Sequence, residues 1–375
     1  MSREPYVRLR DWRSSHNQKI IGCLPMYIPE EIIHAAGILP IVLMGEDIPT
    51  AANEFIQTNT CDVVRSTLDA AVLGKLDFLD GLVFSDICDP VQFLAGVWKI
   101  AHPTPYFHVL DIPHKLSPSS REYLLKVWQE FRTSLEELSG KRITDQELNK
   151  SIHLYNQNRS LLRQLYDLRR ANPGLISASD MVNIISVGLF MPKEEHNALL
   201  SELLVKAEGK KTKGTGVGLM LGGYLCQKPP EEVLDLIEEL GGVILDDEMY
   251  IGARYFAGEV MENNDPMVAL VDYYINRIPC TTMHYPEHYL RTSATVRQDY
   301  PQFLIDTFKK SGADGLVILI VPFCDPYGFK YPTINAKLNE ASVPFLMLET
   351  GLDKGALGTV RTRIQAFLEM LQNQK

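Results

Sequence analysis

Several features that mark common protein classes are missing from this chain of 375 residues. No apolar run approaches the roughly 20 residues that a transmembrane helix requires. The N-terminal sequence MSREPYVRLRDWR is charged from the start and lacks the apolar segment of a signal peptide. The formal net charge of −10 disfavours nucleic acid as the main partner, because phosphate backbones are bound by basic surfaces. We therefore expect a cytoplasmic protein that engages neither nucleic acid nor a membrane.

Two short motifs are also absent. The pattern G-x-x-x-x-G-K-[ST] does not occur, so the chain carries no P-loop of its own for ATP hydrolysis. No C-x-x-C pair occurs either, and the cysteines are widely scattered, at positions 23, 61, 88, 226, 280 and 324. Disulfides are rare in cytoplasmic proteins, so each cysteine is a buried thiol, a ligand or a nucleophile. Buried thiol is the commonest of these fates.

The most informative feature present is a repeated stretch. DGLVILIVPFCDPYGF (314–329) has a near copy early in the chain, DGLVFSDICDPVQF (80–93). Each begins with Asp-Gly, continues as a short apolar run and stops at Cys-Asp-Pro, the pattern of a strand buried on both faces of a parallel sheet. The proline should end each strand, since it has no N–H for the ladder. We thus expect Cys88 and Cys324 where two buried strands finish, and the carboxyl ends of such strands are where ligands bind.

Strands alternate with helical segments on both sides of a central region, which implies parallel sheets. Residues 117–208 lack β-rich runs and contain helix starts, among them the capping box Thr144-x-x-Glu147 and the cap at Ser177. Residues 209–216 (GKKTKGTG) have the composition of a linker. The predicted fold class is α/β, with two similar parallel-sheet lobes of Rossmann or flavodoxin type and an inserted helical domain. The predicted domains are residues 1–116, 117–208 and 209–375.

Two other motifs invite chemical interpretations that we do not favour. GTGVGLMLGG (214–223), with Asp246 downstream, suggests dinucleotide binding, but its glycines precede or enter the strand, so a tight turn explains them better. HYPEH (284–288) has the spelling of an inverted zinc hydrolase motif, yet Pro286 interrupts the continuous helix which that motif needs.

The cysteines offer a third chemistry. Asn59 or Thr60 can cap a helix that runs from Cys61 to Gly74, which places Cys61 in the first turn, where N–H groups and the helix dipole favour a thiolate. Two strand ends and this helix start could present three sulfurs to one iron–sulfur cluster, leaving one iron open. Because the cysteines are widely scattered in the sequence, two alternatives remain open: a metal-free, two-lobed ligand-binding module and a nicotinamide-dependent enzyme.

A family resemblance adds to this interpretation. The chain resembles the 2-hydroxyacyl-CoA dehydratase and benzoyl-CoA reductase family across nearly its full length, through segments that occur in the same order: IGCLPMYIPEEIIHAAGILP, NTCDVVRSTLD, ICDPVQ, ILDDEMYIGARYF, VPFCDP and TRIQAFLEML. The resemblance implies that three cysteines hold a [4Fe-4S] cluster, and they fall on Cys61, Cys88 and Cys324.

The segment DDEMYIGARYFAGEV looks most like the small iron–sulfur core subunit of ATP-dependent (class I) benzoyl-CoA reductase. That likeness implies a two-electron dearomatisation of benzoyl-CoA, or of a substituted analogue, to a cyclic dienoyl-CoA. It also implies a heterotetramer with a larger homologous core subunit and two ATP-hydrolysing, electron-donating subunits, with ferredoxin as the upstream donor. The alternative is the beta subunit of an (R)-2-hydroxyacyl-CoA dehydratase.

Other residues near the motif segments carry weaker expectations. Tyr27 and Glu30, in the PMYIPEE turn, could lie close to the cluster or at an interface, although a helix start with a stabilising acid explains them equally well. Cys23 is expected in the same turn and is the fourth thiol to consider. We interpret Cys226 and Cys280 as structural. The sequence does not identify the proton donor, and no catalytic residue is assigned.

Overall fold

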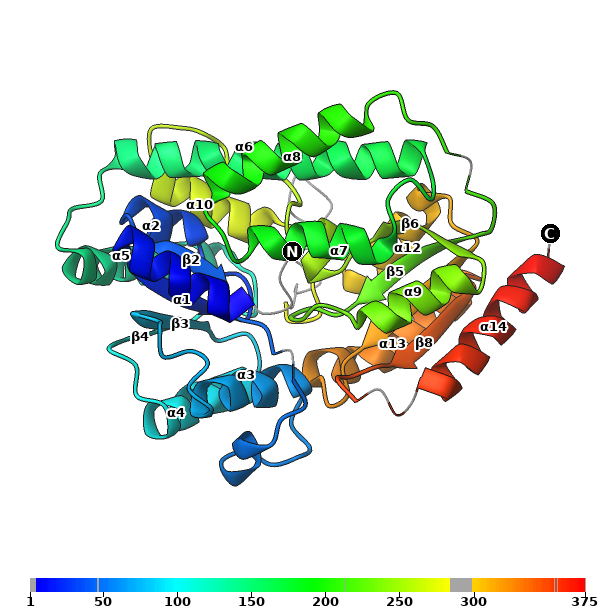
Figure 1. Cartoon of the computed structure of the whole chain (residues 1–375), viewed down its shortest axis with the longest axis horizontal. Helices are drawn as coiled ribbons and strands as arrows, with labels where there is room; N and C mark the ends of the chain where they lie inside the picture. The colour runs from blue at the N-terminus through cyan, green and yellow to red at the C-terminus, as the bar shows by residue number, and fades with distance from the viewer. Residues whose placement is uncertain are drawn as a thin grey trace.

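The computed structural model describes residues 5–374, apart from residues 46, 213, 284–298, 354 and 356. Two four-stranded parallel sheets form its framework (Figure 1). The strands of the first sheet are β1 (Ile20–Leu24), β2 (Leu39–Val42), β3 (Gly81–Ser85) and β4 (Tyr106–Leu110). Those of the second are β5 (Val217–Gly223), β6 (Gly242–Asp247), β7 (Gly315–Ile320) and β8 (Phe345–Glu349).

The two sheets have the same topology. Their strand orders are β2-β1-β3-β4 and β6-β5-β7-β8, so each lobe repeats one βαβ-type winding. Every residue of the central strands β1, β3, β5 and β7 is buried. This confirms the predicted α/β class with two parallel-sheet lobes. We call the first sheet and its helices the N-terminal lobe, and the second sheet and its helices the C-terminal lobe.

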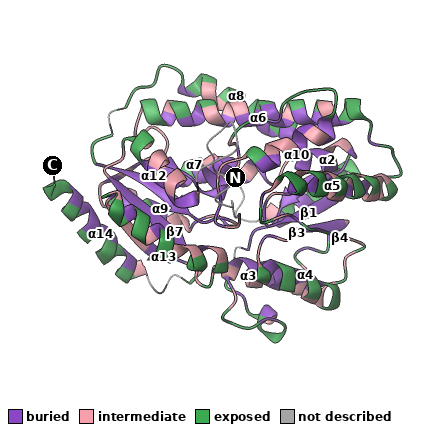
Figure 2. Cartoon of the chain, turned by 180° about the vertical axis from the view of Figure 1, so that it is seen from behind, coloured by how far each residue is buried: buried purple, intermediate pink, exposed green. Residues whose placement is uncertain are grey.

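Amphipathic helices cover the sheets, with one side buried and the other exposed (Figure 2). Those of the N-terminal lobe are α1 (Pro5–His16), α2 (Glu30–Ala35), α3 (Asp62–Val72) and α4 (Asp89–Ala101). The C-terminal lobe contains α9 (Glu231–Glu239), α12 (Tyr300–Ser311), α13 (Asp325–Glu340) and α14 (Leu357–Asn373). Helix α10 (Pro266–Asn276) follows β6 in the chain but packs against the helices that connect the two sheets. Among the described residues, no helix is long and apolar enough to cross a membrane.

Four helices occupy the chain between the two sheets: α5 (Pro118–Ser139), α6 (Asp145–Ala171), α7 (Ala178–Gly188) and α8 (Lys193–Ala207). Helices α6 and α8 run along the top of the view in Figure 1, above both sheets. Near its middle α6 forms a buried ion pair with the N-terminal lobe, Arg159–Glu31. Near its end it forms another with the C-terminal lobe, Arg169–Asp247. The exact division of the chain into three domains stays a prediction.

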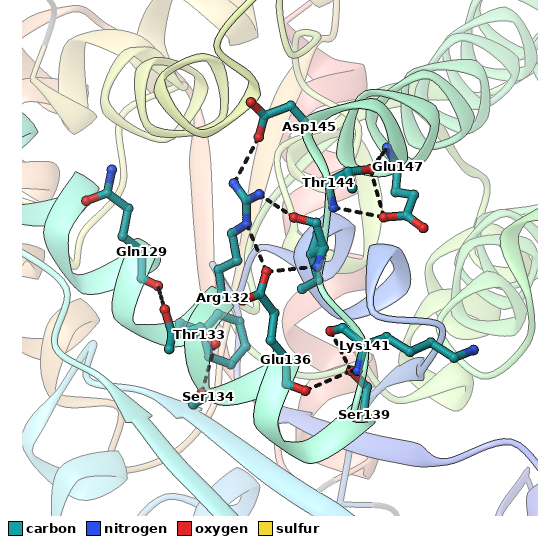
Figure 3. A network of polar contacts seen from close by, with 12 residues as sticks. Gln129, Arg132, Thr133, Ser134, Glu136, Ser139, Lys141, Thr144, Asp145 and Glu147 are labelled. Atoms are coloured by element: carbon teal, nitrogen blue, oxygen red, sulfur yellow. Dashed lines mark hydrogen bonds and ion pairs between the residues drawn. The ribbon is translucent and has the colours of Figure 1, made fainter.

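The capping box predicted for α6 is present. The Thr144 hydroxyl accepts a hydrogen bond from the Glu147 backbone N–H (3.2 Å), and the Glu147 carboxylate accepts one from the Thr144 N–H (2.8 Å). Figure 3 shows this pair beside Arg132, which donates to Asp145 at 3.0 Å. Ser177 likewise caps α7 by accepting from the Asp180 N–H. These sequence patterns therefore identified real helix starts.

Replacing Thr144 with alanine should destabilise the protein by about 1 kcal/mol, because the Glu147 N–H at the start of α6 loses the hydroxyl that caps it. Urea unfolding followed by circular dichroism would measure the change. Thr144→Ser keeps the hydroxyl and is expected to stay close to wild type. Equal losses for both variants would contradict the capping explanation.

His196 is a buried histidine within the helical region. Its Nε2 donates to the Ile184 carbonyl (3.0 Å), and its Nδ1 accepts from the Asn158 side chain (2.8 Å), an arrangement that requires the neutral ring. Burial, together with the nearby Lys193 ammonium, lowers the pKa of His196 to about 4. The unfolded chain therefore binds a proton more readily than the folded chain between that value and the ordinary pKa of about 6.5.

Stability should consequently be complete above pH 6.5 and fall as the pH drops towards 4. We expect the wild-type chain to lose about 2 kcal/mol of unfolding free energy through His196 between pH 7.5 and pH 5.0. His196→Gln cannot titrate, and its unfolding free energy should change less over the same interval. Urea titrations at the two pH values test this, and equal pH sensitivity in the two proteins would refute it.

Candidate functional site

Four thiols line one pocket where the two lobes meet. The pocket encloses about 570 Å³, counting its open mouth, and its lining includes the following cysteines: Cys61, Cys88, Cys226 and Cys324. Cys88 follows β3, whereas Cys226 and Cys324 follow the adjacent strands β5 and β7. These are the carboxyl ends of central strands, the place where open α/β sheets bind ligands. The structure thus places Cys61, Cys88 and Cys324 around one space, and their role as cluster ligands stays a prediction.

Each of these three cysteines occupies the residue immediately before a helix. Cys61 precedes α3, Cys88 precedes α4 and Cys324 precedes α13. In the two repeated motifs, Cys-Asp-Pro is therefore a helix start, with the aspartate first and the proline second, where a missing N–H has no cost. The expectation that the proline ends each strand was wrong, because β3 and β7 end a few residues earlier. The cap of α3 was expected at Asn59 or Thr60, whereas Cys61 itself holds that position.

Burial is the main influence on the pKa of these three thiols, and it favours their neutral form. It raises the pKa of Cys61 to about 11 and that of Cys324 to about 12, and it raises the pKa of Cys88 further. A backbone N–H at each helix start, such as that of Val91 beside Cys88, acts in the opposite direction. The nearby Asp325 carboxylate also raises all three pKa values. The helix starts alone thus do not produce thiolates here, and a bound cation would be required.

Cys226 is the site residue that sequence reasoning missed. It was interpreted as structural, yet it lines the same pocket, and its pKa is raised by burial and by the neighbouring site thiols. A clue was present in the sequence, because Cys226 closely follows β5 just as Cys324 follows β7. Tyr224, between β5 and Cys226, also lines the pocket and has a left-handed backbone (φ 43°).

The remaining candidates lie elsewhere. Cys23 is buried within β1 rather than in the turn that follows, and Cys280 is buried in the core; neither lines the cysteine pocket. Tyr27 and Glu30 line a second pocket. The HYPEH motif (284–288) lies outside the described residues. In the glycine-rich segment, Gly223 has φ 91° and approaches the Leu319 carbonyl, as a tight turn after β5 requires.

Hydrogen bonds between the lobes fix the walls of the cysteine pocket. The Asp62 carboxylate, beside Cys61, accepts from the Leu352 N–H of the C-terminal lobe (3.1 Å). The Gln227 side chain, beside Cys226, donates to the Gly45 carbonyl of the N-terminal lobe (2.9 Å). Residues adjoining two of the site cysteines are thus tied to the opposite lobe, which holds the thiols in a defined arrangement.

The cysteine pocket provides thiols, and thiolates are the usual protein ligands of an iron–sulfur cluster. In the part of the chain that the structure describes, no three His, Cys, Asp or Glu side chains are close enough to hold one metal ion. The pocket walls are mostly apolar, with Val64, Ile87 and Val321 among the lining residues. Such walls limit solvent access, which is one determinant of cluster potential.

Comparisons with known proteins show the family of this chain. Residues 25–371 match the protein family described as 2-hydroxyglutaryl-CoA dehydratase, D-component. The chain is 30% identical to a subunit of the benzoyl-CoA reductase of Thauera aromatica, with 98% of this chain and 95% of the relative covered. It is 28% identical to the (R)-phenyllactyl-CoA dehydratase beta subunit of Clostridium sporogenes (94% and 92% covered). It is 24% identical to the beta subunit of (R)-2-hydroxyglutaryl-CoA dehydratase of Acidaminococcus fermentans (99% and 97% covered).

These relatives are named as subunits of reductases and dehydratases that act on CoA thioesters. The family match covers strands β2 to β8, the helical region between the two sheets and all four thiols of the pocket. The chain therefore belongs to the 2-hydroxyglutaryl-CoA dehydratase D-component family.

Proposed function

We propose that this chain is the small iron–sulfur core subunit of an ATP-dependent benzoyl-CoA reductase. The observation that carries the proposal is the convergence of Cys61, Cys88 and Cys324, each at a helix start, on one pocket between the lobes. These residues would hold a [4Fe-4S] cluster. The relatedness to the benzoyl-CoA reductase protein of Thauera aromatica over 98% of the chain supports the reductase branch.

When bound, the cluster would supply electrons at low potential for reduction of an aromatic acyl thioester to a cyclic dienoyl thioester. The protein's own contribution is the surroundings of the site. Three helix N-termini direct their N–H dipoles towards the thiols, which stabilises negative charge there. The Asp62 and Asp325 carboxylates beside the pocket act in the opposite sense, favouring a low potential. The apolar lining restricts water.

The expected partners follow from the same assignment. A larger homologous core subunit would pair with this one, and two ATP-hydrolysing subunits would deliver electrons taken from ferredoxin. The absence of a P-loop motif from the sequence is compatible with such a division of labour. We place the complex in the cytoplasm.

A second candidate is the beta subunit of an (R)-2-hydroxyacyl-CoA dehydratase, which eliminates water instead of reducing a ring. The match to the D-component family and to the dehydratase beta subunits of two bacteria favours it. Both candidates use the same thiol site, so the arrangement of cysteines does not separate them.

An activity assay separates them. The full complex, purified anaerobically through a tag on this chain, would be supplied with ATP, a reductant and either benzoyl-CoA or an (R)-2-hydroxyacyl-CoA. The proposal predicts a dienoyl-CoA product from benzoyl-CoA, with electron consumption in proportion to product. Turnover of only the hydroxyacyl-CoA, with catalytic rather than stoichiometric electron use, supports the dehydratase. A complex without iron that binds acyl-CoA but converts neither substrate would indicate a ligand-binding module.

A further inference from the structure

A buried series of polar side chains leads from the cysteine pocket into the C-terminal lobe. Tyr327, in the first turn of α13, lines that pocket and is only 1% exposed. Its hydroxyl oxygen lies 3.3 Å from that of Tyr300, the first residue of α12. The Tyr300 hydroxyl in turn donates at 2.6 Å to the carboxylate of Glu248, which directly follows β6. The Tyr327–Tyr300–Glu248 series thus connects the thiol site with one buried carboxylate.

The carboxylate at the inner end of this series acts only as an acceptor. Glu248 forms an ion pair with Arg254 in which both side chains are 1% exposed, and an arginine stays charged in proteins. The Oε1 atom of Glu248 accepts from the Gly223 N–H at 2.8 Å and from the Tyr300 hydroxyl at 2.6 Å. Each of these contacts requires a lone pair on the carboxylate, so Glu248 carries a negative charge.

The charge on Glu248 fixes the direction of both hydroxyl hydrogen bonds. A hydroxyl has a single hydrogen, and Tyr300 donates its hydrogen to Glu248. In the contact between the two tyrosines, Tyr327 is therefore the donor. Hydrogen bonds in series polarise one another, which strengthens this orientation. Tyr327 consequently has no hydrogen left to donate to a group in the cysteine pocket.

The orientation has a consequence for the thiol site because Tyr327 lies next to Cys324. Burial raises the pKa of the Cys324 thiol, and a hydrogen bond from the Tyr327 backbone N–H opposes this effect. The pKa of Tyr327 is itself raised by burial, by Glu248 and by Cys324. The phenol and the thiol are thus close enough to affect one another. Hydrogen bonds to sulfur are among the determinants of the reduction potential of an iron–sulfur cluster.

We propose that Glu248 and Tyr300 are positioning residues that hold the Tyr327 hydroxyl turned away from the thiol site. Held in this way, Tyr327 gives no hydrogen bond to a cluster in the cysteine pocket. Such a bond would stabilise the more negative, reduced form of the cluster and so raise its reduction potential. The orientation of the hydroxyl rests on the contacts of the series, whereas its effect on the potential rests on the proposed function.

The variant Tyr300→Phe isolates the effect. It removes the acceptor of Tyr327, and the cysteine sulfurs that line the neighbouring pocket become the alternative acceptors. The reduction potential of the anaerobically reconstituted chain, measured by a redox titration followed by electron paramagnetic resonance, should become more positive. Tyr327→Phe has no hydroxyl to donate and should stay near the wild-type potential. The double variant, with phenylalanine at both positions, should return to that potential.

Tyr166→Phe is the matched control. The Tyr166 hydroxyl also donates at 2.6 Å to a buried carboxylate, that of Asp247, which is paired with Arg169. Tyr166 does not line the cysteine pocket. A merely structural role predicts that Tyr300→Phe and Tyr166→Phe lose stability without any shift in potential. Our proposal predicts that Tyr300→Phe alone shifts the potential.

Raman difference spectra of the iron-free chain test the orientation without a cluster. The intensity ratio of the tyrosine Fermi doublet distinguishes a phenol that donates a hydrogen bond from one that accepts. The difference between wild type and Tyr327→Phe should show a strongly donating phenol. The same difference measured in the Tyr300→Phe background should lose that signature.

The proposal is overturned if Tyr300→Phe keeps the wild-type potential, if the double variant keeps the shift of Tyr300→Phe, or if Tyr166→Phe shifts the potential equally. It is also overturned if Tyr327 shows no donor signature in the wild-type chain. Circular dichroism verifies the folding of each variant, and the comparison of wild type with Tyr327→Phe decides the orientation even if Tyr300→Phe does not fold. Failure of the proposed function is distinguishable. A wild-type chain that takes up no iron loses the cluster assignment and the effect on potential, while the Raman spectra still decide the orientation.

Discussion

Replacing Cys61, Cys88 or Cys324 with serine is expected to lower the iron content of the anaerobically reconstituted chain from about four per chain to less than about one. Each of these thiols lines the pocket between the lobes, and each is a separate ligand in the proposed site. The two thiols that remain in each variant cannot complete the coordination of a cubane. Iron and acid-labile sulfide analysis, together with the absorption band near 400 nm, would measure the loss.

Cys280→Ser is the matched control for these variants. Cys280 is a buried thiol of the same chain, with 1% exposure, and does not line the cysteine pocket. Its replacement should leave the iron content unchanged. Cys226→Ser is expected to retain the iron but shift the reduction potential, because a thiol at the pocket wall contributes to the surroundings of the cluster. Equal iron loss in all of these variants would indicate a folding defect instead of ligand removal.

Replacing Arg169 with glutamine should reduce the unfolding free energy by about 3–5 kcal/mol. Arg169 and Asp247 form an ion pair in which both side chains are 2% exposed, and this pair attaches α6 to β6. The Tyr166 hydroxyl also donates to the Asp247 carboxylate at 2.6 Å, but it cannot neutralise the charge. The variant would therefore leave a buried carboxylate without its cation. Urea unfolding at pH 7.5 would report the difference.

Arg361→Gln provides the comparison on the surface. Arg361 pairs with Glu239 at 2.9 Å, but the two side chains are 46% and 64% exposed, so water screens the pair. Exposed pairs of this kind contribute about 0–1 kcal/mol. Similar losses of unfolding free energy in the two arginine variants would contradict this explanation. They would mean that the buried Arg169–Asp247 pair contributes no more to stability than an exposed pair.

The architecture could be predicted because its signals are local. The duplicated Asp-Gly runs predicted two central strands, and β3 and β7 are the buried strands at those positions. Thr144 and Glu147 predicted the start of α6 for the same reason, since a capping box involves residues only three positions apart. Predicting that Cys61, Cys88 and Cys324 lie together required information from distant parts of the sequence. The predicted strand ends and the family resemblance provided it.

Other parts of the site could not be predicted from local pattern. Cys226 has no Cys-Asp-Pro context, and only the pairing of β5 with β7 shows that it lies beside Cys324. The second pocket, which Tyr27 and Glu30 line, also includes Trp128 and Arg277, and no spacing rule joins residues so distant in the sequence. The start of α13 was misjudged because a proline after a strand was interpreted as a terminator, when the second position of a helix accepts it equally well.

The most direct test of the central claim is a Mössbauer spectrum of the wild-type chain reconstituted anaerobically with ⁵⁷Fe. If three thiolates from the two lobes hold a cubane, three of its irons each have a cysteine ligand and the fourth does not. The spectrum should therefore show one iron site that differs from the other three. A spectrum of mononuclear iron alone, or a protein that retains no iron, would contradict the account.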